Sequence, residues 1–142
     1  LTTAEVQALA DACPPAVAGY VLLAAYTGIR RGHLLRLTAH DVQGGFLRLD
    51  RSSKTRTLQM VPLHPKVQAL AEALPLGIGN RRLRETWTEA REATGIDCRW
   101  HDLRHTAGVQ FALAGATTTR SASRERRIWP ISLSSVSEKR SP

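Results

Sequence analysis

Cysteines and long apolar runs are scarce in this sequence, and each scarcity excludes a class of protein. The chain has two cysteines, Cys13 and Cys98, which lie far apart and outside any CxxC pattern. A disulfide framework or a cysteine-based metal site is therefore not expected, and both thiols are expected to be buried in a reducing compartment. No apolar run approaches the roughly 20 residues that span a membrane, and the N-terminus lacks a signal-peptide layout. We expect a cytoplasmic protein with no membrane association.

Acidic residues are also few relative to basic ones. The sequence has 12 Asp and Glu against 20 Lys and Arg, which gives a formal charge of +8. Such a charge favours an anionic partner, above all nucleic acid. Half of the charge comes from residues 117–142, where six basic residues stand against two acidic ones, so residues 1–116 carry +4. Charge alone therefore does not establish DNA binding.

Periodic hydrophobicity is missing from the C-terminal part of the chain. Residues 118–142 contain seven Ser, five Arg and two Pro, and they show neither a helical nor a strand period. We expect this segment to be a disordered, aberrant basic tail. Residues 1–117 are expected to form one domain, because that length allows a core of its own.

Residues 1–117 are predicted to form a mainly α-helical domain with a small antiparallel β-sheet, an α+β fold. Gly44 and Gly45 predict a hairpin, and apolar alternation predicts paired strands at 46–50 and 57–61 around a polar turn. Capping residues and prolines mark helix starts, and glycines mark helix ends. The helices are expected at residues 2–12, 16–26, 30–37, 66–74, 80–94 and 101–114.

Several individual residues support these helix predictions. Thr2 and Glu5 have the spacing of a capping box, and Gly28 and Gly95 are expected to end helices. Three further positions are expected to lie in the core, Trp87, Ala90 and Trp100. The helix at 16–26 is apolar nearly all round, so we expect it to be buried.

The most informative stretch is residues 100–106, with the sequence WHDLRHT. On a helix, His101, Arg104 and His105 are spaced i, i+3 and i+4, so they share one face. Leu103, Ala107 and Phe111 then point toward a core. A helix that presents a basic, hydrogen-bond-donating face near its start is suited to bind an anion.

Three motifs in order resemble the catalytic domain of tyrosine recombinases, the phage integrase family. Residues 27–37, TGIRRGHLLRL, resemble the family's TGxRxxELxxL block. Lys54 and Thr55 in a hairpin turn, followed by the VPL of residues 61–63, resemble its KT…VPL block. Residues 101–106, HDLRHT, resemble its HxLRHT block. The resemblance covers about residues 1–117.

This resemblance implies an enzyme that cuts and rejoins DNA through a 3′-phosphotyrosyl bond, without a metal or any other cofactor. Arg30 and Arg104 are then the residues that neutralise the phosphate, because a guanidinium donates two parallel hydrogen bonds and stays charged. Lys54 is implied to protonate the leaving oxygen, and His101 to act as acid, base or phosphate donor. His105 is implied to support the phosphate or the structure. The implied partners are double-stranded DNA and other recombinase subunits, in a prokaryotic cytoplasm or nucleoid.

The sequence departs from the family pattern in two places. His33 stands where the family has an acidic residue that would orient Arg30; a neutral imidazole could support the arginine, whereas a protonated one would repel it. No Tyr follows Tyr26, and no Gly-His pair follows His105. No nucleophile is therefore found, because Tyr20 and Tyr26 lie on the apolar helix and their rings are expected to pack in the core.

From this loss of pattern we expect that a frame change near residues 117–120 has replaced the genuine C-terminus. We also expect that the chain alone does not recombine DNA and binds it weakly, because the family's N-terminal clamping domain is absent. The alternative is a non-catalytic DNA-binding remnant of an integrase. A metal-dependent hydrolase is a distant third, because the HxxxH spacing of His101 and His105 has no evident third ligand and Arg104 would repel a cation.

Overall fold

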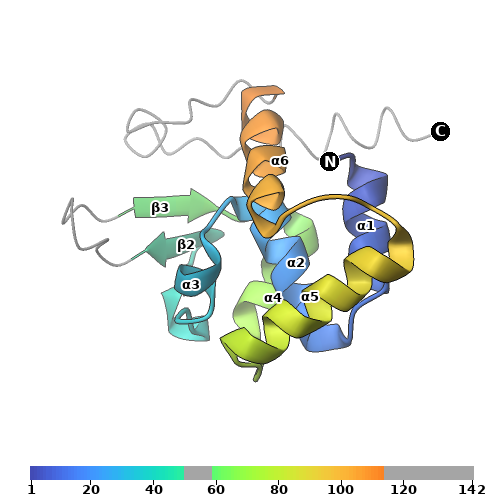
Figure 1. Cartoon of the computed structure of the whole chain (residues 1–142). Helices are drawn as coiled ribbons and strands as arrows, with labels where there is room; N and C mark the ends of the chain where they lie inside the picture. Colours follow the sequence, from blue (N-terminus) through green and yellow to red (C-terminus); the bar gives the residue numbers. More distant parts are fainter. Residues whose placement is uncertain (50–58, 114–142) are drawn as a thin grey trace.

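The computed structural model describes residues 1–49 and 59–113, and this part of the chain is mostly helical with one small sheet (Figure 1). The predicted fold class, helices with a small antiparallel sheet, is confirmed. Helix α2 runs through the centre, with the sheet on one side and α1 and α5 on the other (Figure 1). The polar turn predicted between residues 50 and 57, the predicted end of the last helix at residue 114 and the tail lie outside the described residues.

The first two helices begin and end where the sequence predicts. In α1 (Thr3–Asp11), the Thr2 hydroxyl accepts from the Glu5 amide at 3.1 Å while the Glu5 carboxylate accepts from the Thr2 amide at 2.8 Å, which completes the capping box. Helix α2 (Pro15–Thr27) starts with proline and ends at Gly28, whose φ of 73° is the left-handed conformation that glycine adopts easily. Most of α2 is buried, as its apolar circumference predicts.

The next helix is shorter than predicted. We expected residues 30–37, but α3 spans only Arg31–Leu34, and a 3₁₀ turn, η1 (Ala39–Asp41), follows. Gly32 weakens the helix, and Thr38 begins a capping box of its own with Asp41. Arg30 therefore lies just before α3 in an extended conformation, with φ −64° and ψ 144°, instead of inside its first turn.

The sheet has three antiparallel strands in the order β1-β2-β3. Strands β1 (Val42–Gln43) and β2 (Phe46–Leu49) are joined by Gly44 and Gly45, whose positive φ values of 55° and 83° make the predicted tight hairpin. Strand β3 (Gln59–Pro62) pairs with β2. Leu47 and Leu49 are the buried residues of β2, so one face of the sheet packs on the core.

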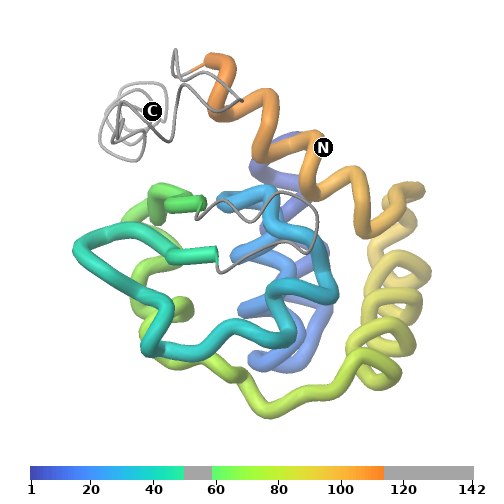
Figure 2. Tube along the Cα trace, turned by 90° about the vertical axis from the view of Figure 1, so that its left-hand side faces the viewer, coloured from blue at the N-terminus to red at the C-terminus, as the bar shows by residue number. Residues whose placement is uncertain are grey.

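Three longer helices complete the domain, α4 (Pro65–Glu72), α5 (Asn80–Thr94) and α6 (Trp100–Leu113). Trp87, Ala90 and Trp100 are buried as predicted, and the two indole rings meet edge to face at 5.1 Å between their centroids. Helix α6 packs mainly on α2, and Figure 2 shows it crossing one side of the domain after the turn from α5. Of the described helices, none is long and apolar enough to cross a membrane.

Two burial predictions are wrong in part. Cys98 is buried, but Cys13 is only half-buried at the end of α1, where its thiol donates to the Leu9 carbonyl at 3.1 Å. Tyr20 is 1% exposed, but Tyr26 is half-buried, with its ring 4.7 Å from the His64 ring. Both exceptions lie near a helix end, where fewer neighbouring elements can cover a side chain.

Candidate functional site

The turn that carries Arg30 is held by one buried hydroxyl. The Thr27 hydroxyl donates to the Leu23 carbonyl at 2.6 Å and accepts from the Ile29 amide at 3.3 Å. The Ile29 side chain is itself buried. These contacts fix Thr27 and Ile29, and with them the backbone that leads to Arg30. Arg30 therefore follows a fixed turn, and it is exposed.

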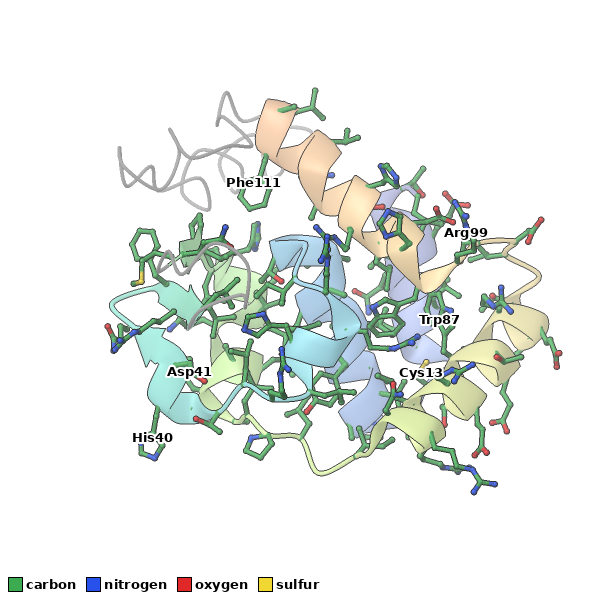
Figure 3. The ribbon with its side chains drawn as sticks, turned by 60° about the vertical axis from the view of Figure 1, so that its left-hand side comes forward. Cys13, His40, Asp41, Trp87, Arg99 and Phe111 are labelled. Atoms are coloured by element: carbon green, nitrogen blue, oxygen red, sulfur yellow. The ribbon has the colours of Figure 1, made fainter. Side chains whose placement is uncertain are left out.

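The helix that carries Arg104 is fixed at its start. The Arg99 amide donates to the Asp102 carboxylate at 2.7 Å, and the Arg99 guanidinium lies 3.5 Å from the other oxygen of that carboxylate. The guanidinium of Arg91, on α5, donates to the Cys98 carbonyl at 2.6 Å. The residues just before α6 are therefore joined to both helices, Cys98 to α5 and Arg99 to α6. Arg99 is labelled near the start of α6 in Figure 3.

Helix α6 meets the Arg30 turn at Gly28. A β-carbon placed on Gly28 would lie 3.3 Å from the Ala107 β-carbon and 4.0 Å from the Arg104 carbonyl oxygen. Such a contact is tighter than most, so the backbone of the turn touches α6 directly. The segments that carry Arg104 and Arg30 are thereby brought into contact, although their motifs lie in different parts of the sequence.

The electrostatics of the arginine pair agree with this closeness. Partial burial and, second, the positive charge of Arg30 lower the pKa of Arg104. Within residues 1–49 and 59–113, no carboxylate forms an ion pair with either guanidinium. Two neighbouring cations without a counter-charge repel each other, and an anion between them would relieve that repulsion.

The two histidines of α6 lie beside Arg104. The rings of His101 and His105 are exposed and stand edge to face, with 5.1 Å between their centroids. Together with Arg104 they line an open hollow along α6, whose other lining residues are Gly108, Val109 and Ala112. Arg30 is not part of the lining, so the arginine pair stands at the border of the hollow.

Two other predicted residues, His33 and Lys54, lie away from this hollow or outside the described residues. Burial and, second, the charge of Arg36 lower the pKa of His33, and Asp41 opposes them, so a neutral imidazole is favoured at pH 7. The His33 backbone amide donates to the Arg30 carbonyl at 3.0 Å, but among the described residues no printed contact joins the His33 ring to the Arg30 guanidinium. Lys54 lies outside the described residues, so its place in the site stays a prediction.

The tyrosines in the described part of the chain are engaged in packing. The Tyr20 hydroxyl accepts from the Leu76 amide at 3.2 Å in the core. Tyr26 contacts His64, a buried residue whose ring nitrogen Nδ1 accepts from the Lys66 amide at 3.1 Å to cap α4. Neither ring lines the hollow of α6.

No group of three or more His, Cys, Asp or Glu side chains could hold a metal among the residues that the structure describes. His101 and His105 thus supply two ligands at most, next to two guanidinium groups that repel a cation. Sequence reasoning placed Thr27 in a motif and Ala107 on the inward face of a helix, but it did not identify their contacts at the Arg30 turn. A small residue three positions after Arg104 on the inward face of α6 was the available signal for Ala107.

Comparisons with known proteins identify the fold. No family model and no curated protein matches the sequence. Among solved structures, the chain is similar to XerA recombinase, with a TM-score of 0.63, 20% identity, and coverage of 100% of this chain and 65% of that one. It is also similar to lambda integrase (residues 75–356) bound to DNA, with a TM-score of 0.59, 22% identity, and coverage of 80% of this chain and 50% of that one.

The chain thus spans about two thirds of the length of the first structure and half of the second. Both neighbours have the arrangement of helices and small antiparallel sheet found here. The three sequence motifs and these two structures agree, and the chain has the tyrosine recombinase fold.

Proposed function

We propose that this chain binds double-stranded DNA and holds one backbone phosphate between Arg30 and Arg104, as the catalytic domain of a DNA recombinase. The observation that carries the proposal is the arginine pair, which the fold holds together without a counter-carboxylate in the described part of the chain. Two guanidinium groups offer parallel donors that match phosphate oxygens. The DNA-bound state of the lambda integrase neighbour supports the same partner.

The chemistry assigned to the site is phosphoryl transfer. Arg30 and Arg104 stabilise the charge that builds on the non-bridging oxygens, and His101 donates a further hydrogen bond from the hollow beside them. A tyrosine hydroxyl gives its proton to His101 acting as base, attacks phosphorus and forms the phosphotyrosyl bond while the bond to the 5′-oxygen breaks. Lys54, which lies between β2 and β3 in the sequence, gives the leaving oxygen its proton.

The nucleophile comes from outside these 142 residues in this proposal. Tyr20 is buried with its hydroxyl bonded, and Tyr26 packs on His64. Phosphoryl transfer through a covalent intermediate needs a tethered, positioned nucleophile. We therefore propose that the chain by itself binds DNA but does not form a covalent adduct. A tyrosine from another polypeptide segment, outside these 142 residues, completes the site.

Binding is tested first, with a DNA duplex titrated at several salt concentrations. Arg30→Ala and Arg104→Ala are each expected to weaken binding about tenfold or more and to reduce the salt slope by about one. Arg84→Ala is the matched control, because Arg84 is an exposed arginine on α5 away from the site. Equal losses for all three variants would reduce the interaction to general charge attraction and reject the proposed site.

Adduct formation is tested next, with a nicked suicide duplex that traps a phosphotyrosyl bond. The full chain alone is expected to give no adduct, and addition of a recombinase fragment that carries the family tyrosine is expected to give one. An adduct from the chain alone, lost in Tyr26→Phe, would overturn the assignment of the nucleophile. Binding at the arginine pair with no adduct in either case would favour the non-catalytic DNA-binding remnant.

A further inference from the structure

The contact between Gly28 and Ala107 is the place where the two arginine-bearing segments touch. Ala107 is 1% exposed, and it lies within close packing distance of the Gly28 backbone. Gly28 has no side chain and adopts φ 73°, so it cannot be replaced without strain, and the only side chain in this contact is the methyl group of Ala107.

The same contact lies next to both arginines along the chain. Arg104 is three residues before Ala107, and its carbonyl oxygen also faces Gly28. On the other side, Arg30 is two residues after Gly28, with buried Ile29 between them. The Thr27 hydroxyl accepts from the Ile29 amide of the turn at 3.3 Å and donates to the Leu23 carbonyl of α2 at 2.6 Å, so the turn is tied to α2.

We propose that Ala107 is a positioning residue, whose small volume sets the distance between Arg30 and Arg104. This inference rests on the proposed phosphate-binding function of the pair. A larger side chain at position 107 pushes α6 away from the turn, because closely packed interiors do not absorb added methyl groups without displacement. Arg104 moves with α6 while Arg30 stays with the turn, and the two guanidinium groups no longer meet one phosphate.

The test compares matched substitutions in the full chain. Ala107→Val is expected to weaken binding of the nicked duplex about tenfold at a temperature where circular dichroism shows the domain folded. Ala90→Val is the control, because Ala90 is equally buried on a helix that carries no site residue. Ala107→Ser, which adds a single oxygen, is expected to bind within about twofold of the parent chain.

A double-mutant cycle separates positioning from simple packing. In an Arg104→Ala background, Ala107→Val is expected to cause little further loss of DNA affinity, because the pair that it displaces is already broken. Equal loss of affinity in Ala107→Val and Ala90→Val, or full additivity with Arg104→Ala, would overturn the inference. Failure of the proposed function is distinct, since Arg30→Ala and Arg104→Ala would then weaken DNA binding no more than the control Arg84→Ala does. If Ala107→Val does not fold, Ala107→Ser and Ala107→Cys provide a graded series for the same cycle.

Discussion

Helices α2 and α6 pack on each other, yet they differ in what they show to solvent. Helix α2 is buried on most sides, and the turn after its C-terminal end meets α6 at Gly28. Helix α6 buries four residues, while His101 and His105 are exposed and Val109 and Leu113 are 58% and 70% exposed. The buried helix fixes the place of Arg30, and the half-exposed helix presents Arg104 and the histidines.

This difference shows how a small domain supports a polar site. Side chains proposed to bind an anion need solvent or ligand on one side, so their own helix cannot be fully covered. Their positions are nevertheless held by the covered helix beneath, through contacts such as Thr27 with Leu23 and Gly28 with Ala107. Phe111 illustrates the inward side of α6, because it projects toward the body of the domain, as its sequence position predicts (Figure 3).

The largest expected effect tests the buried helix. Leu23→Ala removes a fully buried side chain from α2 and is expected to lower the free energy of unfolding by about 2–5 kcal/mol, because a cavity is left behind. Urea denaturation followed by circular dichroism measures this. A loss below about 1 kcal/mol would show that α2 is not the packed centre of the domain.

A pH titration of stability comes next, because it tests His64, which packs against Tyr26 of α2. Burial lowers the pKa of His64 to about 4, so the unfolded chain, with an ordinary value, binds the proton more readily. Stability is expected to be full above about pH 6.5 and to fall as pH drops toward 4. Melting temperatures across this range measure the slope.

The matched variant in this titration is His64→Asn, which keeps an acceptor at the cap of α4 and does not titrate. Its slope between pH 6.5 and 4 is expected to be shallower than that of the parent chain. His33, whose pKa is also lowered by burial, contributes a slope of the same sign, so His33→Asn is the second control. An unchanged slope in His64→Asn would contradict the assignment.

A smaller effect is expected at the junction of the two helices. Thr27→Val removes a hydroxyl that makes two hydrogen bonds and leaves the Ile29 amide without its partner, at a cost of about 1–3 kcal/mol. Thr27→Ser keeps the hydroxyl and should lose less than half as much. Thermal denaturation compares the two, and equal losses would mean that the methyl group, not the hydroxyl, stabilises the turn.

The smallest effect is expected on the exposed side of α6. Val109→Ala removes a side chain that is 58% exposed, and alanine favours a helix, so the free energy of unfolding should change by no more than about 0.5 kcal/mol. Calorimetry of both proteins at equal concentration measures the difference. A loss of 2 kcal/mol or more would show that this face of α6 is covered in solution and that the contrast with α2 is weaker than the structure indicates.

Local chemistry made much of the fold predictable from the sequence. Proline at the start of α2, glycine at its end and the Thr2–Glu5 capping box act within a few residues, and each lies where the sequence predicts. The Gly44–Gly45 hairpin is local in the same sense. The helix predicted at residues 30–37 is shorter in the structure because Gly32 weakens it and because Thr38 begins a capping box with Asp41.

Only the tertiary structure decided how the parts of the candidate site meet. The sequence names Arg30, His101 and Arg104 by motif, but spacing along a chain cannot tell which helix end touches which helix face. That arrangement depends on the methyl group of Ala107 against the Gly28 backbone, and on the core of α2 beneath them. The half-burial of Tyr26 was likewise decided by packing, because the neighbours that cover a side chain come from distant segments.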